Sequence, residues 1–286
     1  MVKSYAKLMR IHHYIKNLLV FAALAFSGQF FVWDKLFSAF MGFAAFCLVS
    51  SAVYIINDIR DREKDKNHPT KCKRPIASGD VPVKNAGILA IFLLVAAIAC
   101  NFVVFQILSS LLLLLYFAIN LAYSFGLKNI PLLDITILVA GFLIRVIYGA
   151  VVTDIAISNW LYLTVIAVAF YFALGKRRNE LRKAGSETRK VLKSYPVNFL
   201  DKNMYMCLAL ANVFYALWSM SESTIAFYHN RYLVFTVPIV LLITMKYSMN
   251  VERESDGDPV EVLLHDKILL GLCIAYLAVM FFILYI

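Results

Sequence analysis

Long apolar stretches, separated by short polar or strongly charged segments, recur along the whole sequence. A transmembrane helix needs about 20 mostly apolar residues to cross the hydrocarbon of a bilayer. The pattern therefore predicts an all-α, polytopic membrane protein with about nine spans in a single domain, residues 1–286. The predicted spans are residues 17–33, 37–57, 85–103, 105–125, 133–152, 159–175, 204–222, 231–249 and 266–286. The third and fourth nearly touch, so we expect a tight turn near Asn101 to Gln106, with one long helix as the alternative.

Composition agrees with a membrane protein and leaves no room for a separate soluble domain. Hydrophobic residues make up 62% of the chain and charged residues 16%, and the mean hydropathy is +0.74. These values lie outside the range of soluble domains of this length. The five cysteines are scattered, and we expect them to be packing residues. Because no signal-peptide cleavage site follows the basic N-terminal stretch, we expect the first helix to be retained.

The distribution of basic residues predicts the orientation in the membrane. If the N-terminus is cytoplasmic, all but three of the 28 lysines and arginines fall in cytoplasmic segments. The exceptions are Lys35, Arg231 and Arg145, the last of which lies within a span. This asymmetry agrees with the positive-inside rule and predicts a cytoplasmic active site and a C-terminus outside. The net charge of +10 then reflects orientation and anionic lipid headgroups, and we expect no nucleic-acid partner.

The most informative polar segment follows the second predicted span and reads Asn57-Asp58-x-x-Asp61-x-x-x-Asp65. On a helix the three aspartates share one face with Asn57 nearby, and their like charges repel unless a cation joins them. Clustered carboxylates suit Mg²⁺, which takes its remaining ligands from water and substrate phosphates. We therefore predict a Mg²⁺ site for a diphosphate substrate. The alternative is a solvated helix end in which the neighbouring basic residues pair with the acids.

A second polar segment, residues 69–79, is rich in basic residues. Lys71, Lys73 and Arg74 stand beside a proline-set turn and a Ser-Gly pair. Lysine and arginine side chains in such a turn can bind phosphate oxygens. The alternative is ordinary positive charge on the cytoplasmic side.

Three positions around the fourth and fifth spans are further candidates. Arg145 lies about three turns inside a span, where an ionisable residue is costly unless it faces a wet cavity or a partner. This favours a functional role for Arg145, with a structural ion pair as the alternative. Tyr123 and Lys128 follow the fourth span, where tyrosine is commonly only a membrane-interface residue.

The end of the sixth span carries a mixed-charge segment. Lys176 and Glu180 share a helix face, with Arg177 beside them. Charge asymmetry alone would explain the two cations, but it would not require the glutamate. The five histidines show no metal-ligand spacing, and histidine catalysis is not expected.

The aspartate motif, with Lys73-Arg74-Pro75-Ile76-Ala77-Ser78-Gly79 downstream, resembles the first motif of the UbiA superfamily of intramembrane prenyltransferases. The resemblance covers essentially the whole chain. Within the superfamily the chain is most similar to the decaprenyl-phosphate phosphoribosyltransferases. The similar segments are Lys16-Asn17-Leu18-Leu19-Val20-Phe21, Tyr123-Ser124-x-x-Leu127-Lys128, Gly175-Lys176-Arg177-x-x-Glu180 and Gly257-Asp258-Pro259.

The resemblance implies a UbiA-like helical bundle in the plasma (inner) membrane of a bacterium. It implies a Mg²⁺-dependent enzyme that transfers 5-phosphoribose from phosphoribosyl diphosphate (PRPP) to a polyprenyl (decaprenyl) phosphate, releasing diphosphate, for arabinan or related cell-envelope glycans. Typical prenyltransferases of the superfamily carry a second aspartate-rich motif after the sixth span, where this chain has Lys176, Arg177 and Glu180. Because both substrates of phosphoribosyl transfer are polyanions, the extra cations favour that reaction.

The roles implied by the resemblance divide the candidate residues into groups. The expected catalytic residues are Asp58, Asp61 and Arg145, and the expected metal ligands are Asp58, Asp61 and Asp65. The expected substrate-binding residues are Lys16, Asn17, Asn57, Asp65, Lys71, Lys73, Arg74, Tyr123, Lys128, Lys176, Arg177 and Glu180. Of the basic residues, Lys16, Lys128 and Arg145 are expected to orient the lipid phosphate.

Two other functions remain open. A UbiA-type prenyltransferase that joins a prenyl diphosphate to an aromatic quinone or haem precursor would use the same first motif, with an acidic second motif close to Glu180. A transporter would suit nine spans and a buried Arg145, but the discontinuous helices in matching halves that are typical of transporters are not evident. The sequence leaves open whether the protein forms a homo-oligomer.

Overall fold

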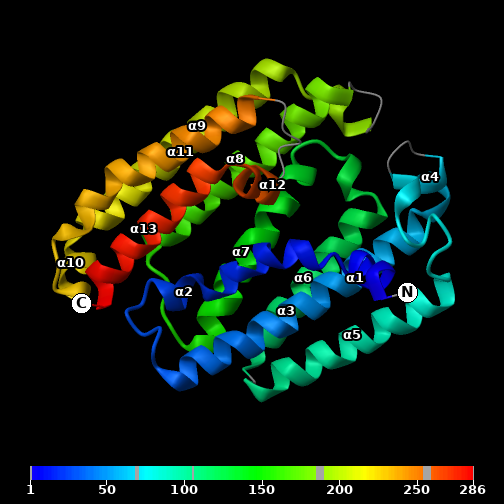
Figure 1. The fold of residues 1–286 in the computed structure, drawn as a ribbon, viewed down its shortest axis with the longest axis horizontal. Helices are drawn as coiled ribbons and strands as arrows, with labels where there is room; N and C mark the ends of the chain where they lie inside the picture. Colours follow the sequence, from blue (N-terminus) through cyan, green and yellow to red (C-terminus); the bar gives the residue numbers. More distant parts are fainter. Residues whose placement is uncertain (1, 68–70, 105, 185–189, 254–258, 286) are drawn as a thin grey trace. The chain divides into compact units, whose positions relative to one another are not determined.

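The computed structural model describes residues 2–67, 71–104, 106–184, 190–253 and 259–285. These residues form helices and connecting turns with no strand among them, which confirms the all-α prediction (Figure 1). The chain divides into two compact units. The first comprises Met1–Gly126 and Ile144–Ala156, and the second comprises Leu127–Leu143 and Ile157–Ile286.

The first unit contains the N-terminal helices and the end of α7. Its elements, with η for a 3-10 helix, are α1 (Val2–Met9), η1 (Ile11–Phe21), α2 (Ala22–Ala25), α3 (Trp33–Arg60), α4 (Arg62–Lys66), η2 (Lys71–Lys73), α5 (Val83–Val103), α6 (Ile107–Phe125) and the last part of α7 (Leu133–Thr153).

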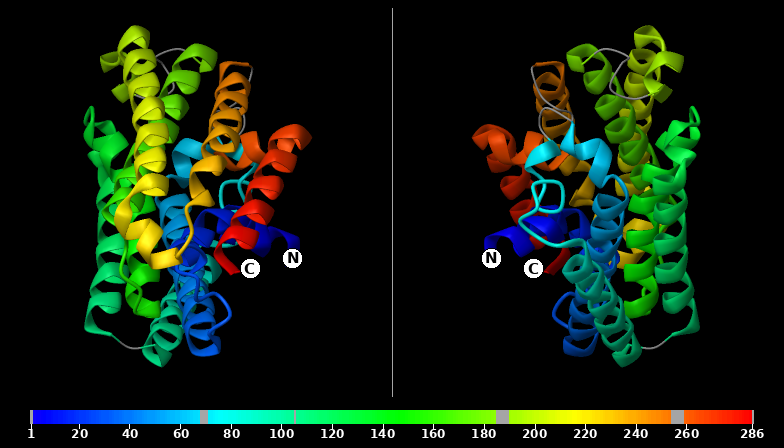
Figure 2. Two further views of the ribbon diagram at one scale, coloured as in Figure 1. Left: turned by 90° about the vertical axis from the view of Figure 1, so that its left-hand side faces the viewer. Right: turned by 90° about the vertical axis from the view of Figure 1, so that its right-hand side faces the viewer.

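Helix α5 packs antiparallel alongside α3 (Figures 1 and 2). Ala86, Ala90, Leu93 and Ala97 recur every three or four residues and form the buried face of α5. Small residues at such positions let two helix backbones approach closely. The opposite face carries exposed apolar side chains such as Phe92, as expected for a helix in contact with lipid hydrocarbon.

The 3-10 helix η1 lies along α3. Since three residues make one turn of a 3-10 helix, Tyr14, Asn17 and Val20 stand in one row. The Tyr14 hydroxyl is 2.8 Å from Ser51 Oγ on α3. Val20 lies against Gly149 of α7, where an added Cβ atom would come within 1.9 Å of the Val20 carbonyl oxygen. Glycine at this position therefore allows η1 to pass so close to α7.

The second unit contains the start of α7 and all later helices. Its elements are η3 (Leu127–Asn129), the first part of α7, α8 (Asn159–Ala184), η5 (Lys190–Ser194), α9 (Val197–Met220), α10 (Glu222–Tyr228), η6 (Tyr232–Thr236), α11 (Val237–Glu252), α12 (Pro259–His265) and α13 (Lys267–Tyr285). Helices α8 and α9 pack together along much of their length, and α11 contacts α9 and α13. Ala173, Leu200, Met204 and Tyr247 contribute to the core of this unit.

In the described part of the chain, seven helices are long and apolar enough to cross a membrane, or eight if α9 and α10, which meet at a 54° bend, form one span. The chain is thus an integral membrane protein, but the count of nine is not confirmed. The predicted break between the third and fourth spans is confirmed, because α5 ends at Val103 and α6 begins at Ile107, so the two are not one long helix.

Two predicted spans account for the difference in count. The span at 204–222 falls in α9, which counts only together with α10, and residues 17–33 do not form one long α-helix. The helical part of this stretch, η1 and α2, ends at Ala25. Asn17 is buried and bonded to α3, and the chain turns at Gly28, whose φ of +67° is left-handed. A polar side chain held inside the unit and a turn after α2 explain why apolar composition alone did not give a continuous helix here.

Candidate active site

Two buried aspartates and two arginines form an acid–base cluster at the end of α3, here called the aspartate cluster (Arg10, Asp58, Asp65 and Arg74). Arg10 Nη2 donates to Asp58 Oδ1 at 2.7 Å, and Arg74 Nη1 donates to the same oxygen at 3.1 Å. The same Arg74 nitrogen donates to Asp65 Oδ2 at 2.7 Å. Both aspartates are buried. The guanidinium groups offset the cost of enclosing these carboxylates in protein.

The backbone around Asp61 keeps the two aspartates on one side. Helix α3 ends just before Asp61 and α4 begins just after it. The Asp61 N–H donates to the Asn57 carbonyl and the Asp65 N–H donates to the Asp61 carbonyl, both at 2.9 Å. Because these bonds continue the helical pattern across the break, Asp58 and Asp65 remain on the common side that their spacing predicts.

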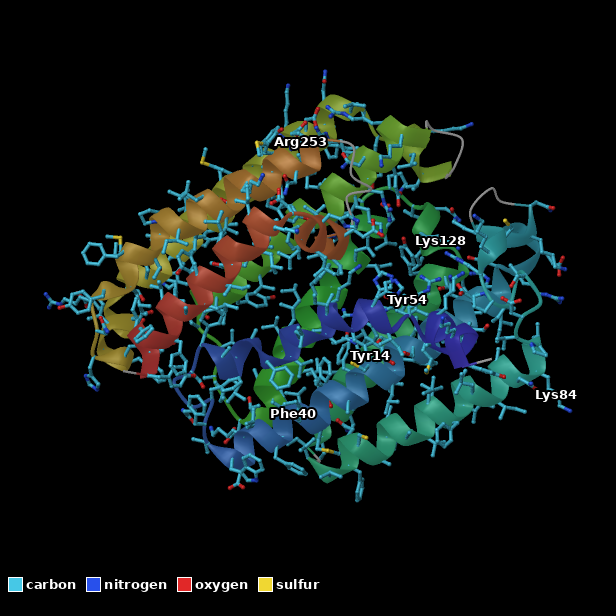
Figure 3. All side chains as sticks on the ribbon, viewed as in Figure 1. Tyr14, Phe40, Tyr54, Lys84, Lys128 and Arg253 are labelled. Atoms are coloured by element: carbon cyan, nitrogen blue, oxygen red, sulfur yellow. The ribbon has the colours of Figure 1, made fainter. Side chains whose placement is uncertain are left out.

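The two arginines reach the cluster from separate turns. Arg10 follows α1 with a φ of +53°, a left-handed conformation uncommon for residues other than glycine. Its guanidinium lies 4.6 Å from the ring centroid of Tyr54, which is labelled in Figure 3. The turn that carries Arg74 is closed by its N–H bond to the Lys71 carbonyl and by the bond from the Ser78 N–H to the Arg74 carbonyl.

The aspartate cluster contains ligands suited to Mg²⁺, which binds one or two carboxylates and completes its shell with water and phosphate oxygens. One Arg74 nitrogen already lies between oxygens of Asp58 and Asp65, as a cation would. The donor set therefore fits a hard divalent ion. No three His, Cys, Asp or Glu side chains are grouped to hold a metal within the described residues. Asp58, Asp61 and Asp65 are therefore not grouped as three ligands in this part of the chain, and the metal-binding role of Asp61 stays a prediction.

Arg145 lies in a separate polar site inside the first unit. Its Nε donates to Asn17 Oδ1 at 2.8 Å and its Nη2 donates to Tyr116 Oη at 3.0 Å. Asn17 in turn donates to Ser50 on α3. Ser50 precedes Asp58 by eight residues, about 12 Å along an α-helix. Arg145 therefore has the polar partners that its burial requires, but the structure does not bring it into the aspartate cluster.

The second unit holds a different acid–base group, here called the arginine network (Asp134, Arg177, Glu180 and Tyr195). Arg177 Nε donates to Asp134 Oδ2 at 2.6 Å, and Arg177 Nη1 donates to Glu180 Oε2 at 2.8 Å. The Tyr195 hydroxyl donates to Asp134 Oδ1 at 2.6 Å. Burial and this hydrogen bond raise the pKa of Tyr195, so its hydroxyl stays protonated as the donor.

The remaining predicted residues are distributed over both units. Half-buried side chains are those of Lys16, Asn57, Lys71, Tyr123, Lys128 and Lys176. The Lys73 side chain is exposed, and its carbonyl accepts a hydrogen bond from Lys7 Nζ at 2.8 Å. Of the predicted segments, Pro69 and Thr70 and the pair Gly257 and Asp258 lie outside the described residues.

Three residues of the aspartate cluster and the arginine network are absent from the sequence-based set. Arg10 contacts Asp58 from 48 positions away, and Asp134 and Tyr195 contact each other across 61 positions. Asp134 could have been identified from the sequence, since a carboxylate in the first turn of a membrane span is costly without a partner. Arg10 and Tyr195 stand in basic, aromatic stretches where nothing local distinguishes them.

The chain is similar to characterised proteins over most of its length. Its sequence matches the UbiA prenyltransferase family over residues 17–268. A decaprenyl-phosphate phosphoribosyltransferase from Mycolicibacterium smegmatis is 36% identical over 291 residues, covering 97% of this chain and 91% of that protein. A protein of the same name from Corynebacterium glutamicum is 32% identical, covering 94% of this chain and 83% of that protein.

The fold is also shared with a solved structure. The structure of a UbiA homolog from Archaeoglobus fulgidus bound to GPP and Mg²⁺ matches with a TM-score of 0.73, covering 98% of this chain and 99% of that chain. The sequence identity in this match is 18%, so the likeness concerns the fold alone.

Proposed function

Because the chain belongs to the UbiA prenyltransferase family, we propose that it transfers 5-phosphoribose from PRPP to a polyprenyl phosphate, with decaprenyl phosphate as the expected acceptor. The observation that carries this proposal is the similarity over nearly the whole chain, at 36% identity, to a decaprenyl-phosphate phosphoribosyltransferase. The proposed product is a precursor of cell-envelope arabinan or a related glycan. The proposed location is a bacterial inner membrane, with the reaction on the cytoplasmic side where the basic residues gather.

The reaction exchanges one bond at the anomeric carbon of ribose. The bond from this carbon to the diphosphate oxygen breaks, and diphosphate leaves with the electron pair. A phosphate oxygen of the lipid forms the new bond. Because this phosphate is already ionised at neutral pH, the reaction needs no strong general base. A site built from carboxylates and basic groups, without a histidine base, is therefore sufficient for this reaction.

The aspartate cluster is the proposed site for the diphosphate and its Mg²⁺. Asp58 and Asp65 are the proposed ligands, with Asp61 and Asn57 beside them. A bound Mg²⁺ would neutralise negative charge on the leaving diphosphate. Of the two arginines in the aspartate cluster, Arg74 is the proposed phosphate-binding group, because it already lies between the two carboxylates.

Basic side chains complete the proposed assignments. Lys71 and Lys73, which flank the turn that carries Arg74, are proposed to bind donor phosphates with it. Lys16 and Arg145, both in the first unit, remain the proposed partners of the lipid phosphate, and the same role for Lys128 stays a prediction from the sequence.

A prenyltransferase with an aromatic acceptor is the second candidate, because the fold is shared with a UbiA homolog bound to GPP and Mg²⁺. That reaction would favour an acidic second motif near Glu180, and Asp134 does lie close by. Both of these carboxylates accept hydrogen bonds from Arg177, however, and because Arg177 is buried it cannot leave their oxygens to a metal ion without an uncompensated charge inside the protein. The arginine network thus supports phosphoribosyl transfer over this alternative.

The test is transfer of label from ribose-labelled PRPP into the lipid phase. Purified protein is incubated with decaprenyl phosphate and Mg²⁺, beside Asp58→Ala and a matched control, Glu63→Ala, whose carboxylate is exposed. We expect labelled lipid with the wild type and Glu63→Ala, and none with Asp58→Ala or after chelation of the metal. No transfer, under conditions where a prenyl diphosphate is consumed with an aromatic acceptor, would favour the prenyltransferase.

A further inference from the structure

A cavity of about 370 Å³ lies between α3, α5 and α6, within the first unit. Val49, Leu94 and Phe117 are among its lining residues, and in the described part of the chain the lining is apolar except for Asn101 and Ser110. A water molecule needs two or more polar partners to stay in such a space, so an apolar cavity does not hold water. The volume lies in the range of ligand-binding cavities, about 300–1,000 Å³. The cavity is therefore suited to an apolar ligand.

The cavity is bordered by side chains that are exposed on the surfaces of α5 and α6. Ile98 and Leu114 both line it, although 69% and 62% of these residues are exposed. Because α5 and α6 are long and apolar enough to cross a membrane, their exposed apolar side chains contact lipid hydrocarbon. A hydrocarbon chain of the bilayer can thus enter the cavity from the side without passing through water. By filling it, the chain restores van der Waals contacts that an empty space denies to the lining.

The cavity extends from one end of α5 toward the middle of the membrane. Because α5 runs antiparallel to α3, the end of α5 at Val103 lies away from the aspartate cluster. Asn101 stands two residues before that end, and Leu94 stands seven residues deeper, about 10 Å along the helix axis. The hydrocarbon of one leaflet is about 15 Å thick, half of the core of a bilayer. The cavity therefore spans much of one leaflet, with its polar residues at the headgroup end.

Polar residues from α5, α6 and α7 meet at the headgroup end of the cavity. The buried Tyr148 hydroxyl donates to Asn101 Oδ1 at 2.8 Å, and Asn101 Nδ2 donates to Ser110 Oγ at 2.9 Å. Tyr148 and Asn101 thus fix the position of Ser110, which is half-buried. A serine hydroxyl that accepts one hydrogen bond can still donate one. Ser110 can therefore donate to a carbonyl oxygen of a ligand in the cavity.

We propose that the cavity binds one acyl chain of a bilayer glycerophospholipid, from the leaflet away from the aspartate cluster, and that Ser110 donates to the ester carbonyl of this chain. The ester stands at the headgroup end of an acyl chain, where Ser110 lies, and the apolar chain follows the cavity toward Leu94. A polyprenyl tail is also apolar, but it carries no carbonyl for Ser110. The bound lipid fills the space between α3, α5 and α6 and stabilises their packing. The inference does not depend on the reaction that the protein performs.

The experiment measures lipid binding to the purified, delipidated protein by native mass spectrometry. Dioleoyl phosphatidylglycerol, its ether-linked analogue and decaprenyl phosphate are offered in equal amounts. We expect the wild type to bind one ester-linked lipid about fivefold more tightly than the ether-linked analogue, which is the ratio that one neutral hydrogen bond gives. Ser110→Ala should bind the ester-linked and ether-linked lipids equally, because it lacks the hydroxyl.

A tryptophan at the border of the cavity tests whether the lipid lies inside it. We expect Leu114→Trp, which places a larger side chain there, to lose the tightly bound lipid. It should also lose the rise in melting temperature that added phosphatidylglycerol gives the wild type. The matched control is Leu111→Trp on the same helix, because Leu111 is also exposed, at 54%, but does not line the cavity in the described structure. This control should bind lipid as the wild type does.

Three outcomes would overturn the inference. The first is an equal loss of lipid in the two tryptophan variants, and the second is a wild type that does not prefer the ester-linked lipid. The third is binding of decaprenyl phosphate in place of phosphatidylglycerol, lost in Leu114→Trp only, which would assign the cavity to the tail of the proposed acceptor. None of these results bears on transfer from PRPP, so the proposed function is tested separately.

Discussion

The aspartate cluster and the arginine network use the same residue types in opposite arrangements. In the aspartate cluster the acids are enclosed, while the side chains of Arg10 and Arg74 are 20% and 25% exposed. In the arginine network the Arg177 side chain is 1% exposed, and the exposed member is an acid, Glu180. One group keeps its cations at the surface, and the other keeps its cation inside.

This difference separates pairs that can exchange partners from pairs that cannot. A partly exposed arginine can leave a carboxylate for water or a phosphate, and a metal ion can take its place. A buried arginine cannot leave without an uncompensated charge in the protein, which is strongly destabilising. The aspartate cluster is therefore suited to ligand exchange, and the arginine network to holding a fixed geometry.

The largest expected effect is on catalysis in the aspartate cluster. Asp58→Asn keeps the shape of the side chain but removes its charge, and we expect kcat/KM for PRPP to fall about a hundredfold or more, because the metal and leaving group lose a ligand. Steady-state assays of label transfer measure the loss. The neutralised variant Glu63→Gln, on exposed α4, should retain wild-type activity. A similar loss of kcat/KM in both variants would show that the reaction depends on negative charge near the end of α3 in general and not on the Asp58 carboxylate in particular.

The next effect is on stability, and it should be larger in the arginine network. Asp134→Ala removes the fully buried one of the two carboxylates that Arg177 binds, and we expect the free energy of unfolding to fall by about 3–5 kcal/mol. Asp58→Ala should cost less, because its two arginines can turn to solvent. Thermal and denaturant unfolding in the same detergent compare the two variants. A greater loss for Asp58→Ala would contradict the distinction between exchangeable and fixed pairs.

A smaller effect is expected on metal binding without substrate. Arg10 competes with a divalent ion for Asp58, so Arg10→Gln should bind Mn²⁺ about fivefold more tightly, since an ion pair open to solvent contributes on the order of 1 kcal/mol. Paramagnetic resonance of free Mn²⁺ gives the affinity. Lys64→Gln removes one charge from the exposed side of α4 and should leave the affinity unchanged. Weaker binding in Arg10→Gln would mean that Arg10 supports the metal site and does not compete with it.

The smallest effect concerns the exposed pair of Glu63 and Lys66 on α4. The hydrogen bond from Lys66 lowers the pKa of the Glu63 carboxyl. Its contribution to stability is therefore present above the unfolded pKa of about 4.3 and is lost as pH falls through the lower folded value. We expect the melting temperatures of the wild type and Glu63→Gln to agree at pH 7 and pH 3 within experimental error, because exposed pairs contribute little. A clear difference at pH 7 only would show that α4 is held by this pair.

Much of the fold follows from local patterns, whereas much of the site does not. Helices α3, α5 and α6 match predicted spans, because an apolar stretch of sufficient length has few other stable forms in a bilayer. The common side of Asp58 and Asp65 also follows from their spacing on a helix. The partners Arg10 and Tyr195 do not, because each is brought to its carboxylate by the path of the chain.

Residues 17–33 do not form the predicted continuous helix, and the reason is again a contact between distant parts of the chain. Apolar composition predicts a span there, but Asn17 bonds to Arg145, which is 128 positions away. A polar pair across this separation leaves no periodic signal. Burial of Arg145 pointed to a partner, and only the fold identifies Asn17 and Tyr116 as two of its partners.

The 3-10 form of η1 has a consequence for how this protein can vary in length. Its turn is three residues, so one inserted or deleted residue rotates everything beyond it by about 120°. A single residue inserted between Tyr14 and Asn17 would rotate the side-chain amide of Asn17 away from Arg145. It would also turn a different side chain toward Gly149. Three inserted residues would instead restore the angular register and shift the row along its axis. Natural or engineered changes in this segment should therefore be tolerated in steps of three.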